Sequence, residues 1–199
     1  TSLTPASCIR LLGPKFALLA RAYRDYNALK RTSDNAGPIV VSFGMADPEQ
    51  LTERTTSLIA TELPPHLRAI VVAPSAESLR RLKAMRLSSN FEIVGPQPSL
   101  ARLLASAGLA IGGTGGTSIE RIFYRVPTIA VPLVANQERT ARFLANHGLA
   151  VIVGRTQPNF ENEMRRVLRN AFRKPPRFPE NGLQIDGLGA ERVAAHLLN

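Results

Sequence analysis

The chain has 199 residues, of which 44% are hydrophobic and 20% charged. That composition supports one buried core and excludes a disordered polyelectrolyte. Lys and Arg exceed Asp and Glu by 25 to 15, so the net charge of +10 indicates an anionic partner such as phosphate, nucleic acid or an acidic surface. Apolar runs are too short for a membrane-spanning helix, and the single cysteine, Cys8, excludes a disulfide framework. Without a signal-peptide pattern, we expect a cytoplasmic protein.

Residues 1–37 differ in pattern from the rest of the chain. A helix is expected from about Phe16 to Lys30, and the polar segment Arg31–Gly37 is typical of a loop. We interpret residues 1–37 as a connector with a peripheral helix, outside the core. Residues 38–199 form the expected domain.

From residue 38 on, short β-branched runs alternate with longer amphipathic segments. The expected strands are Ile39–Phe43, Ala69–Ala73, Phe91–Val94, Leu109–Ile111, Thr128–Val131 and Ala150–Val153. The expected helices are Pro48–Glu62, Ala76–Met85, Ser99–Ser106, Thr117–Tyr124, Gln137–His147, Phe160–Phe172 and Ala190–Leu198. This alternation predicts an α/β, Rossmann-like fold with a parallel six-stranded sheet and helices on both faces.

Ligands of open parallel sheets bind beyond the carboxyl ends of the strands, so the loops there are the candidate site. Ser42 and Gly44 follow the first expected strand, and Gly95 follows the third, within a Pro-rich turn. Asn136 and Gln137 follow the fifth, where an amide side chain serves a sugar hydroxyl or caps a helix equally well.

The loop after the fourth expected strand is the most informative segment. It has four glycines in the five residues Gly112–Gly116, followed by Thr117, Ser118 and then Glu120. Exposed backbone amides at a helix start attract phosphate. The spacing matches neither a Walker A loop nor the dinucleotide fingerprint. Glu120 would accept from the hydroxyls of a ribose, or would simply favour the start of the helix.

These loops become one crevice if the strands follow the order 3-2-1-4-5-6, because the first and fourth strands are then neighbours. Such a crevice suits a nucleoside diphosphate that carries a sugar. The basic stretch between Arg165 and Arg177 is typical of a solvated helix face, with weak association with an anionic surface as the alternative. No motif for specific nucleic-acid binding accompanies it. No metal or other cofactor is expected, because the loops offer no acidic cluster that would hold Mg²⁺ between phosphates.

Several segments in combination carry a resemblance to a known family. They are Gly13–Leu19, Ser42–Pro48, the glycine loop up to Glu120-Arg121, Pro127-Thr128, Asn136-Gln137 and Asp186–Val193. Together they resemble the C-terminal half of the UDP-sugar hydrolases of pseudaminic acid biosynthesis, which act on UDP-2,4-diacetamido-2,4,6-trideoxy-β-L-altropyranose. More distantly, they are similar to the N-acetylglucosaminyltransferase that makes lipid II and to GT-B glycosyltransferases in general.

The resemblance implies two Rossmann-like domains that face each other across a cleft, with UDP or a UDP-sugar held by the C-terminal domain. By motif position it implies roles for Ser42, Gly44, Gly115, Gly116, Thr117 and Ser118 at the diphosphate, Glu120 at the ribose, Gly95 at the uracil, and Asn136 and Gln137 at the sugar. Water would attack the anomeric carbon, and the catalytic base would be a histidine of an N-terminal domain, which is the expected partner. The catalytic residue therefore stays unknown for this chain.

Three positions depart from the family: Met45 and Arg125 where glycines are common, and Ala135 where an acid is usual. The leading interpretation is the UDP-sugar-binding domain of a hydrolase that releases UDP from a diacetamido-trideoxy sugar, a fragment without activity of its own. The alternatives are the donor-binding domain of a GT-B glycosyltransferase and a non-catalytic nucleotide-binding module.

Overall fold

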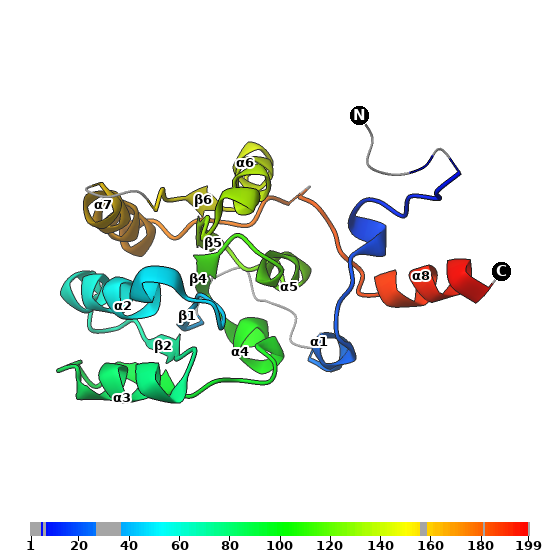
Figure 1. Cartoon of the computed structure of the whole chain (residues 1–199). Coiled ribbons are helices and arrows are strands. Elements are labelled where there is room, and N and C mark those ends of the chain that lie inside the picture. Colours follow the sequence, from blue (N-terminus) through cyan, green and yellow to red (C-terminus); the bar gives the residue numbers. More distant parts are fainter. Residues whose placement is uncertain (1–4, 6, 27–36, 156–158, 181, 199) are drawn as a thin grey trace.

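A computed structural model describes residues 5, 7–26, 37–155, 159–180 and 182–198 of the chain. Six parallel strands form one sheet in the order β3-β2-β1-β4-β5-β6, with helices on both faces (Figure 1). The strands are β1 (Ile39–Ser42), β2 (Ala69–Val72), β3 (Phe91–Val94), β4 (Leu109–Gly113), β5 (Thr128–Val131) and β6 (Val151–Ile152). The predicted fold class and strand order are both confirmed.

The switch point of the sheet lies between β1 and β4. These strands pair in parallel from Ile39 opposite Leu109 to Ser42 opposite Gly112. The chain leaves β1 toward β2 and leaves β4 toward β5, on opposite sides of this pair. The loops after β1 and β4 therefore emerge side by side, which is where parallel α/β sheets bind their ligands.

One face of the sheet is covered by α2 (Leu51–Glu62), α3 (Ala76–Ala84) and α7 (Phe160–Arg173) (Figure 1). Their apolar stripes meet alternate residues of the strands in one large core cluster, in which Phe160 and Leu168 are fully buried. The 3.6-residue period of α7 predicts this packing.

The other face is covered by α1 (Arg21–Asp25), α4 (Ala101–Ser106), α5 (Thr117–Phe123) and α6 (Glu138–Asn146). Their core cluster includes Tyr23, Phe123 and Tyr124. The last helix, α8 (Gly189–Leu198), lies farther out, beside the N-terminal 3₁₀ turn Pro14–Phe16 (Figure 1).

The prediction for the N-terminal helix is partly wrong. The backbone is extended at Ala17 and Ala20, and within the described residues the helix is limited to Arg21–Asp25. Packing overrides local propensity here: a Cβ at Gly189 would lie 2.2 Å from the Ala17 carbonyl oxygen, so the two backbones are in direct contact. The expected residues 27–36 of helix and loop lie outside the described residues.

The expectation that this segment stays outside the core is also wrong, because Leu19 and Tyr23 are buried in the second core cluster. The helix expected from Pro48 begins only at Leu51, after a 3₁₀ turn in which Glu49 and Gln50 have positive φ. The other helices start within two residues of their expected positions, and α3, α5 and α7 start at the expected residue.

Much of the basic character of α7 is paired at the surface. Arg165 and Arg169 both contact the Glu62 carboxylate of α2, with nitrogen–oxygen distances of 3.2 and 2.7 Å. This agrees with the interpretation of a solvated helix face. None of the helices in the described ranges combines the length and the hydropathy that a bilayer crossing requires.

Candidate functional site

A cavity of about 290 Å³ opens at the carboxyl edge of the sheet, at the switch point. The loops after β1, β2 and β3, the start of α5 and the helix α1 supply its walls. Its lining residues are Tyr23, Ser42, Gly44, Met45, Val72, Ala73, Pro74, Pro96, Gln97, Pro98, Ser99, Leu100, Thr117 and Glu120. A cavity therefore lies at the expected edge of the sheet, and segments far apart in the sequence build it. Neither the glycines of Gly112–Gly116 nor Asn136 and Gln137 belong to its lining, so the expected crevice is found only in part.

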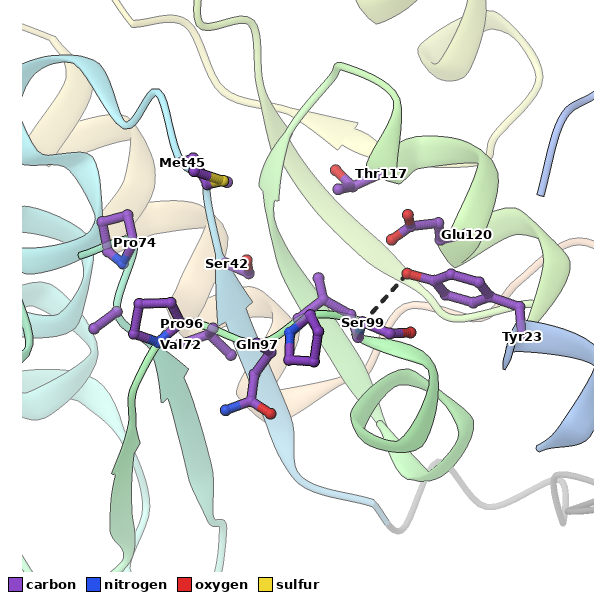
Figure 2. A pocket seen from close by; sticks show the side chains of 14 residues that line it. Tyr23, Ser42, Met45, Val72, Pro74, Pro96, Gln97, Ser99, Thr117 and Glu120 are labelled. Atoms are coloured by element: carbon purple, nitrogen blue, oxygen red, sulfur yellow. Dashed lines mark hydrogen bonds between the residues drawn. The ribbon is translucent and has the colours of Figure 1, made fainter. Parts of the chain in front are cut away.

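The cavity has two chemically different sides. Val72, Pro74 and Pro96 make one side apolar and rigid, whereas Thr117 and Glu120 line the opposite side (Figure 2). A flat aromatic base suits the first side, because apolar walls gain from burying its faces. Carboxylate and hydroxyl groups suit the hydroxyls of a sugar.

Glu120 lies on the first turn of α5, and its carboxylate points into the cavity (Figure 2). Its Oε2 atom is buried and has no hydrogen-bond partner among the described residues. An orphaned buried acceptor costs about 1–3 kcal/mol, more when it is charged. A ligand hydroxyl that donates a hydrogen bond to Oε2 would remove that cost.

Tyr23 reaches the same corner of the cavity from α1 and was not predicted as a site residue. Its hydroxyl oxygen accepts from the Leu100 amide at 3.4 Å and faces Glu120 (Figure 2). Burial, together with the hydrogen bond to Glu120 and the charge of that carboxylate, raises the pKa of Tyr23 well above its ordinary value. The Tyr23 phenol therefore stays protonated at neutral pH.

The glycine loop needs its small residues for close packing. A Cβ at Gly112 would lie 2.1 Å from the Ser42 carbonyl oxygen, and one at Gly113 would lie 2.8 Å from the Leu133 side chain. At Gly116 the same position is open, so this glycine faces free space. The loop is therefore tightly packed at Gly112 and Gly113, whereas its tip at Gly116 is open.

Arg121 anchors the loop from beneath. It is 4% exposed, and its guanidinium donates to the Gly113 carbonyl and, at 3.2 Å, to the Ser118 hydroxyl. Together with Ser42 and Thr117 it also lines a second cavity of about 10 Å³. Burial lowers the pKa of Arg121 to about 10, against the opposing effect of the Glu120 charge, so this guanidinium stays a cation.

The predicted sugar and phosphate residues are only partly brought together. Ser118 is buried against Arg121 and does not line the cavity. The Gln137 Oε1 atom accepts from the Leu133 amide at 3.0 Å and from the Thr114 hydroxyl at 3.2 Å. Gln137 therefore braces the glycine loop near Gly115, while Asn136 is exposed beside it and outside the cavity wall.

The remaining predicted residues lie at the rim. Ser42 and Gly44 line the cavity, and Gly44 has the positive φ that its turn requires. Gly95 lies just behind the wall, where its carbonyl accepts from Gln97. Met45, at 91% exposure, projects at the mouth.

Sequence reasoning missed Tyr23 because the preceding segment was assigned to the periphery. No local pattern marks Tyr23, because Leu19 precedes the short helix Arg21–Asp25 and both side chains are buried by contacts with segments far along the chain. Arg125 also departs from the glycine common in the resembled family, yet it keeps a positive φ of 55°. The position therefore retains a glycine-like backbone. The Arg125 guanidinium lies over the Phe178 ring.

No family model matches the chain, and no curated protein matches it either. Solved structures do match. The MurG protein of Acinetobacter baumannii is 18% identical with a TM-score of 0.59, over 89% of this chain and 53% of MurG. The spinosyn rhamnosyltransferase SpnG is 18% identical with a TM-score of 0.58, over 94% and 50%. The glycosyltransferase VinC, solved with dTDP, is 21% identical with a TM-score of 0.53, over 90% and 40%.

These likenesses, all under 25% identity, establish the fold: a Rossmann-like α/β domain that matches the C-terminal domain of GT-B glycosyltransferases. The chain spans roughly 40–53% of the length of these three solved proteins. SpnG and VinC are glycosyltransferases, and the comparisons do not show the hydrolase of pseudaminic acid biosynthesis.

Proposed function

We propose that this chain is the nucleotide-sugar-binding half of a GT-B glycosyltransferase. The carrying observation is Glu120, which lines a cavity at the switch point of the sheet and whose buried Oε2 atom has no hydrogen-bond partner among the described residues. Three solved proteins with this fold support the proposal, one of which was captured with a nucleoside diphosphate.

Each part of the cavity has a role in this proposal. The base lies against the apolar side of the cavity at Pro74 and Pro96, and a ribose hydroxyl donates a hydrogen bond to Glu120. The diphosphate lies along the tip of the glycine loop at Gly115, Gly116 and Thr117, where backbone amides and the buried Arg121 cation supply positive potential. The sugar then projects past Met45 and Asn136, toward a second domain that supplies the acceptor site.

A UDP-sugar hydrolase of the pseudaminic acid type is the second candidate, and the motif combination that ends in Asp186–Val193 favours it. Both reactions release UDP, and both use the same binding half. They differ in whether water or an acceptor hydroxyl attacks the anomeric carbon. Free sugar as the product of the parent protein would identify the hydrolase, and a glycosylated acceptor would identify the transferase.

Calorimetric titration of the chain with UDP, with ADP and uridine as reference ligands, tests the binding role. We expect saturable binding that prefers UDP, and Glu120→Ala should weaken it by about 1–3 kcal/mol, the cost of losing a hydrogen bond to a charged group.

The matched control is Glu92→Ala, because Glu92 is an exposed glutamate near the amino end of β3, away from the cavity. It should bind UDP like the parent. Equal UDP affinity in the Glu120 variant and in the parent would contradict the ribose assignment.

A further inference from the structure

The corner of the cavity at Glu120 is completed by a residue from outside the sheet. Tyr23 comes from α1, precedes β1 in the sequence and is 4% exposed. Its backbone carbonyl accepts from the Tyr124 hydroxyl at 2.6 Å, and the two rings pack with their centroids 6.0 Å apart. Because Tyr124 follows directly on α5, the helix that carries Glu120 also holds Tyr23 in place.

The Tyr23 hydroxyl meets three polar groups, which are the Leu100 amide, the Ser99 hydroxyl and the Glu120 carboxylate. The Leu100 amide already donates to its oxygen, so the phenolic proton must go to an acceptor. The Glu120 carboxylate is the charged acceptor that faces it (Figure 2). Tyr23 thus ties one part of Glu120 to the rigid α1–α5 contact.

The rest of the carboxylate stays free. Glu120 Oε2 is buried and without a partner among the described residues, so a side chain that lines the cavity keeps one unused acceptor. A glutamate side chain loses conformational freedom when it binds a ligand, and one that is already held loses less. The bond from Tyr23 therefore prepares Glu120 for a ligand hydroxyl.

We propose that Tyr23 is a positioning residue that orients Glu120 and thereby makes the cavity select ribose over sugars without hydroxyls at positions 2 and 3. The inference rests on the proposed nucleotide-binding function. The physical basis of selection is that a ligand without those hydroxyls leaves the buried Oε2 atom unpaired, and a site built to bind a hydroxyl rejects an analogue that lacks it.

The test compares UDP with 2′,3′-dideoxy-UDP by calorimetry on the parent and on Tyr23→Phe. The variant should bind UDP about tenfold more weakly, as for the loss of one hydrogen bond that acts through a charged group. Its affinity for dideoxy-UDP should stay within about twofold of that of the parent, since this ligand makes no bond to Glu120. A tyrosine that only shapes the fold would weaken both ligands equally, so an unchanged ratio would overturn the proposal.

Two controls sharpen this result. Tyr26→Phe removes the same hydroxyl from a half-exposed tyrosine at the end of α1 that does not line the cavity, and it should leave the ratio unchanged. In a Glu120→Ala background, Tyr23→Phe should have no further effect on UDP affinity, because Tyr23 acts through Glu120. Additive effects of the two substitutions would contradict that mechanism.

A second readout applies if Tyr23→Phe does not fold. The chain has three tyrosines, so the parent labelled with 3-fluorotyrosine gives three ¹⁹F resonances, which Tyr26→Phe and Tyr124→Phe assign. The Tyr23 resonance should move in Glu120→Gln and again on addition of UDP. A resonance that moves with neither overturns the contact. If the parent binds no nucleotide, the proposed function itself fails, which is a different result from an unchanged ratio.

Discussion

The two faces of the sheet use buried side chains for different purposes. The face under α2, α3 and α7 has a large apolar core with buried hydroxyl side chains at its edge, such as those of Thr52 and Thr55. Its charged side chains form ion pairs, such as Arg54 with Glu161 at 2.6 Å and Arg81 with the mostly buried Glu53 at 2.8 Å. The face under α1, α4, α5 and α6 has buried polar groups at the cavity and beside it, among them Tyr23 and Arg121. Among the described residues, Arg121 is the only charged side chain classed as buried, and it belongs to this second face.

The two faces differ in the free-energy cost of burying a charged side chain. Removing a cation from water is destabilising unless nearby charges and hydrogen bonds compensate, and for Arg121 the Glu120 charge offsets part of the desolvation. Within the described part of the chain, Arg121 donates only to neutral oxygens, those of Gly113 and Ser118. Both faces have buried polar atoms without a partner among the described residues, for example Glu53 Oε2 on the first and Glu120 Oε2 on the second. Of these two glutamates, Glu120 lines the cavity and Glu53 does not, so the second face is the one that we propose to serve a ligand.

A substitution in the core of the first face should have the largest effect on the free energy of unfolding. Phe160 is 0% exposed in the α7 core, so Phe160→Ala should lower the free energy of unfolding by about 3–5 kcal/mol. Denaturant unfolding measures this, with Phe143→Ala, a 41% exposed phenyl group of α6, as the matched control that costs much less. Below its melting temperature, the Phe160 variant should bind UDP like the parent. A loss of UDP affinity in the folded variant would remove the distinction between the faces.

A substitution on the second face should instead change UDP affinity more than the free energy of unfolding. Arg121→Met removes a buried charge and two hydrogen bonds, whose effects on folding oppose each other, so unfolding should change little. UDP affinity should fall by about 2 kcal/mol, the size expected for charges several ångströms apart at an effective dielectric constant near 20. Uridine affinity should be unchanged, because uridine has no phosphate.

Arg125→Met is the control for this change, since it removes an equal charge from a residue that contacts Phe178 and lies outside the cavity wall. An Arg121 variant that loses UDP and uridine affinity to the same degree would show that Arg121 only supports the fold.

The smallest expected effect concerns α8, at the edge of the second face. The Arg192 guanidinium lowers the pKa of Asp186 to about 2 from the ordinary value of 3.8. A depressed carboxyl pKa stabilises the folded state above the ordinary value, and the contribution is lost as pH falls through about 4 to 2. We therefore expect the NMR shifts of α8 amides to change over that range. Asp186→Asn should remove this change, whereas pH-independent shifts in the parent would contradict the role of the pair.

The sequence predicted the first face better than the second for a physical reason. β-branched runs and the 3.6-residue period of α7 report burial directly, so strands, helices and their order follow from local pattern plus the switch-point rule. The glycine loop was identified from its composition as a phosphate-binding loop, and that role stays a prediction. The structure adds a steric role for Gly112 and Gly113, which are tightly packed.

The corner at Tyr23 could not be predicted in this way, because it depends on contacts between segments far apart in the chain. Tyr23 meets Leu100 and Tyr124 only after folding. Gln137 was expected at a sugar, yet its side chain is engaged with Leu133 and Thr114, because nothing in a single amide shows which partner it will find. Hydrogen-bond partners of this kind need the structure.

The central claim is that the orphaned carboxylate oxygen of Glu120 receives a ribose hydroxyl, and a crystal structure of the chain with bound UDP tests it most directly. The account predicts the uracil between Pro74 and Pro96, the diphosphate at the tip of the glycine loop, and a ribose hydroxyl about 2.5–3.0 Å from the Glu120 carboxylate. UDP bound elsewhere, a ribose turned away from Glu120, or an empty cavity at saturating UDP would contradict it.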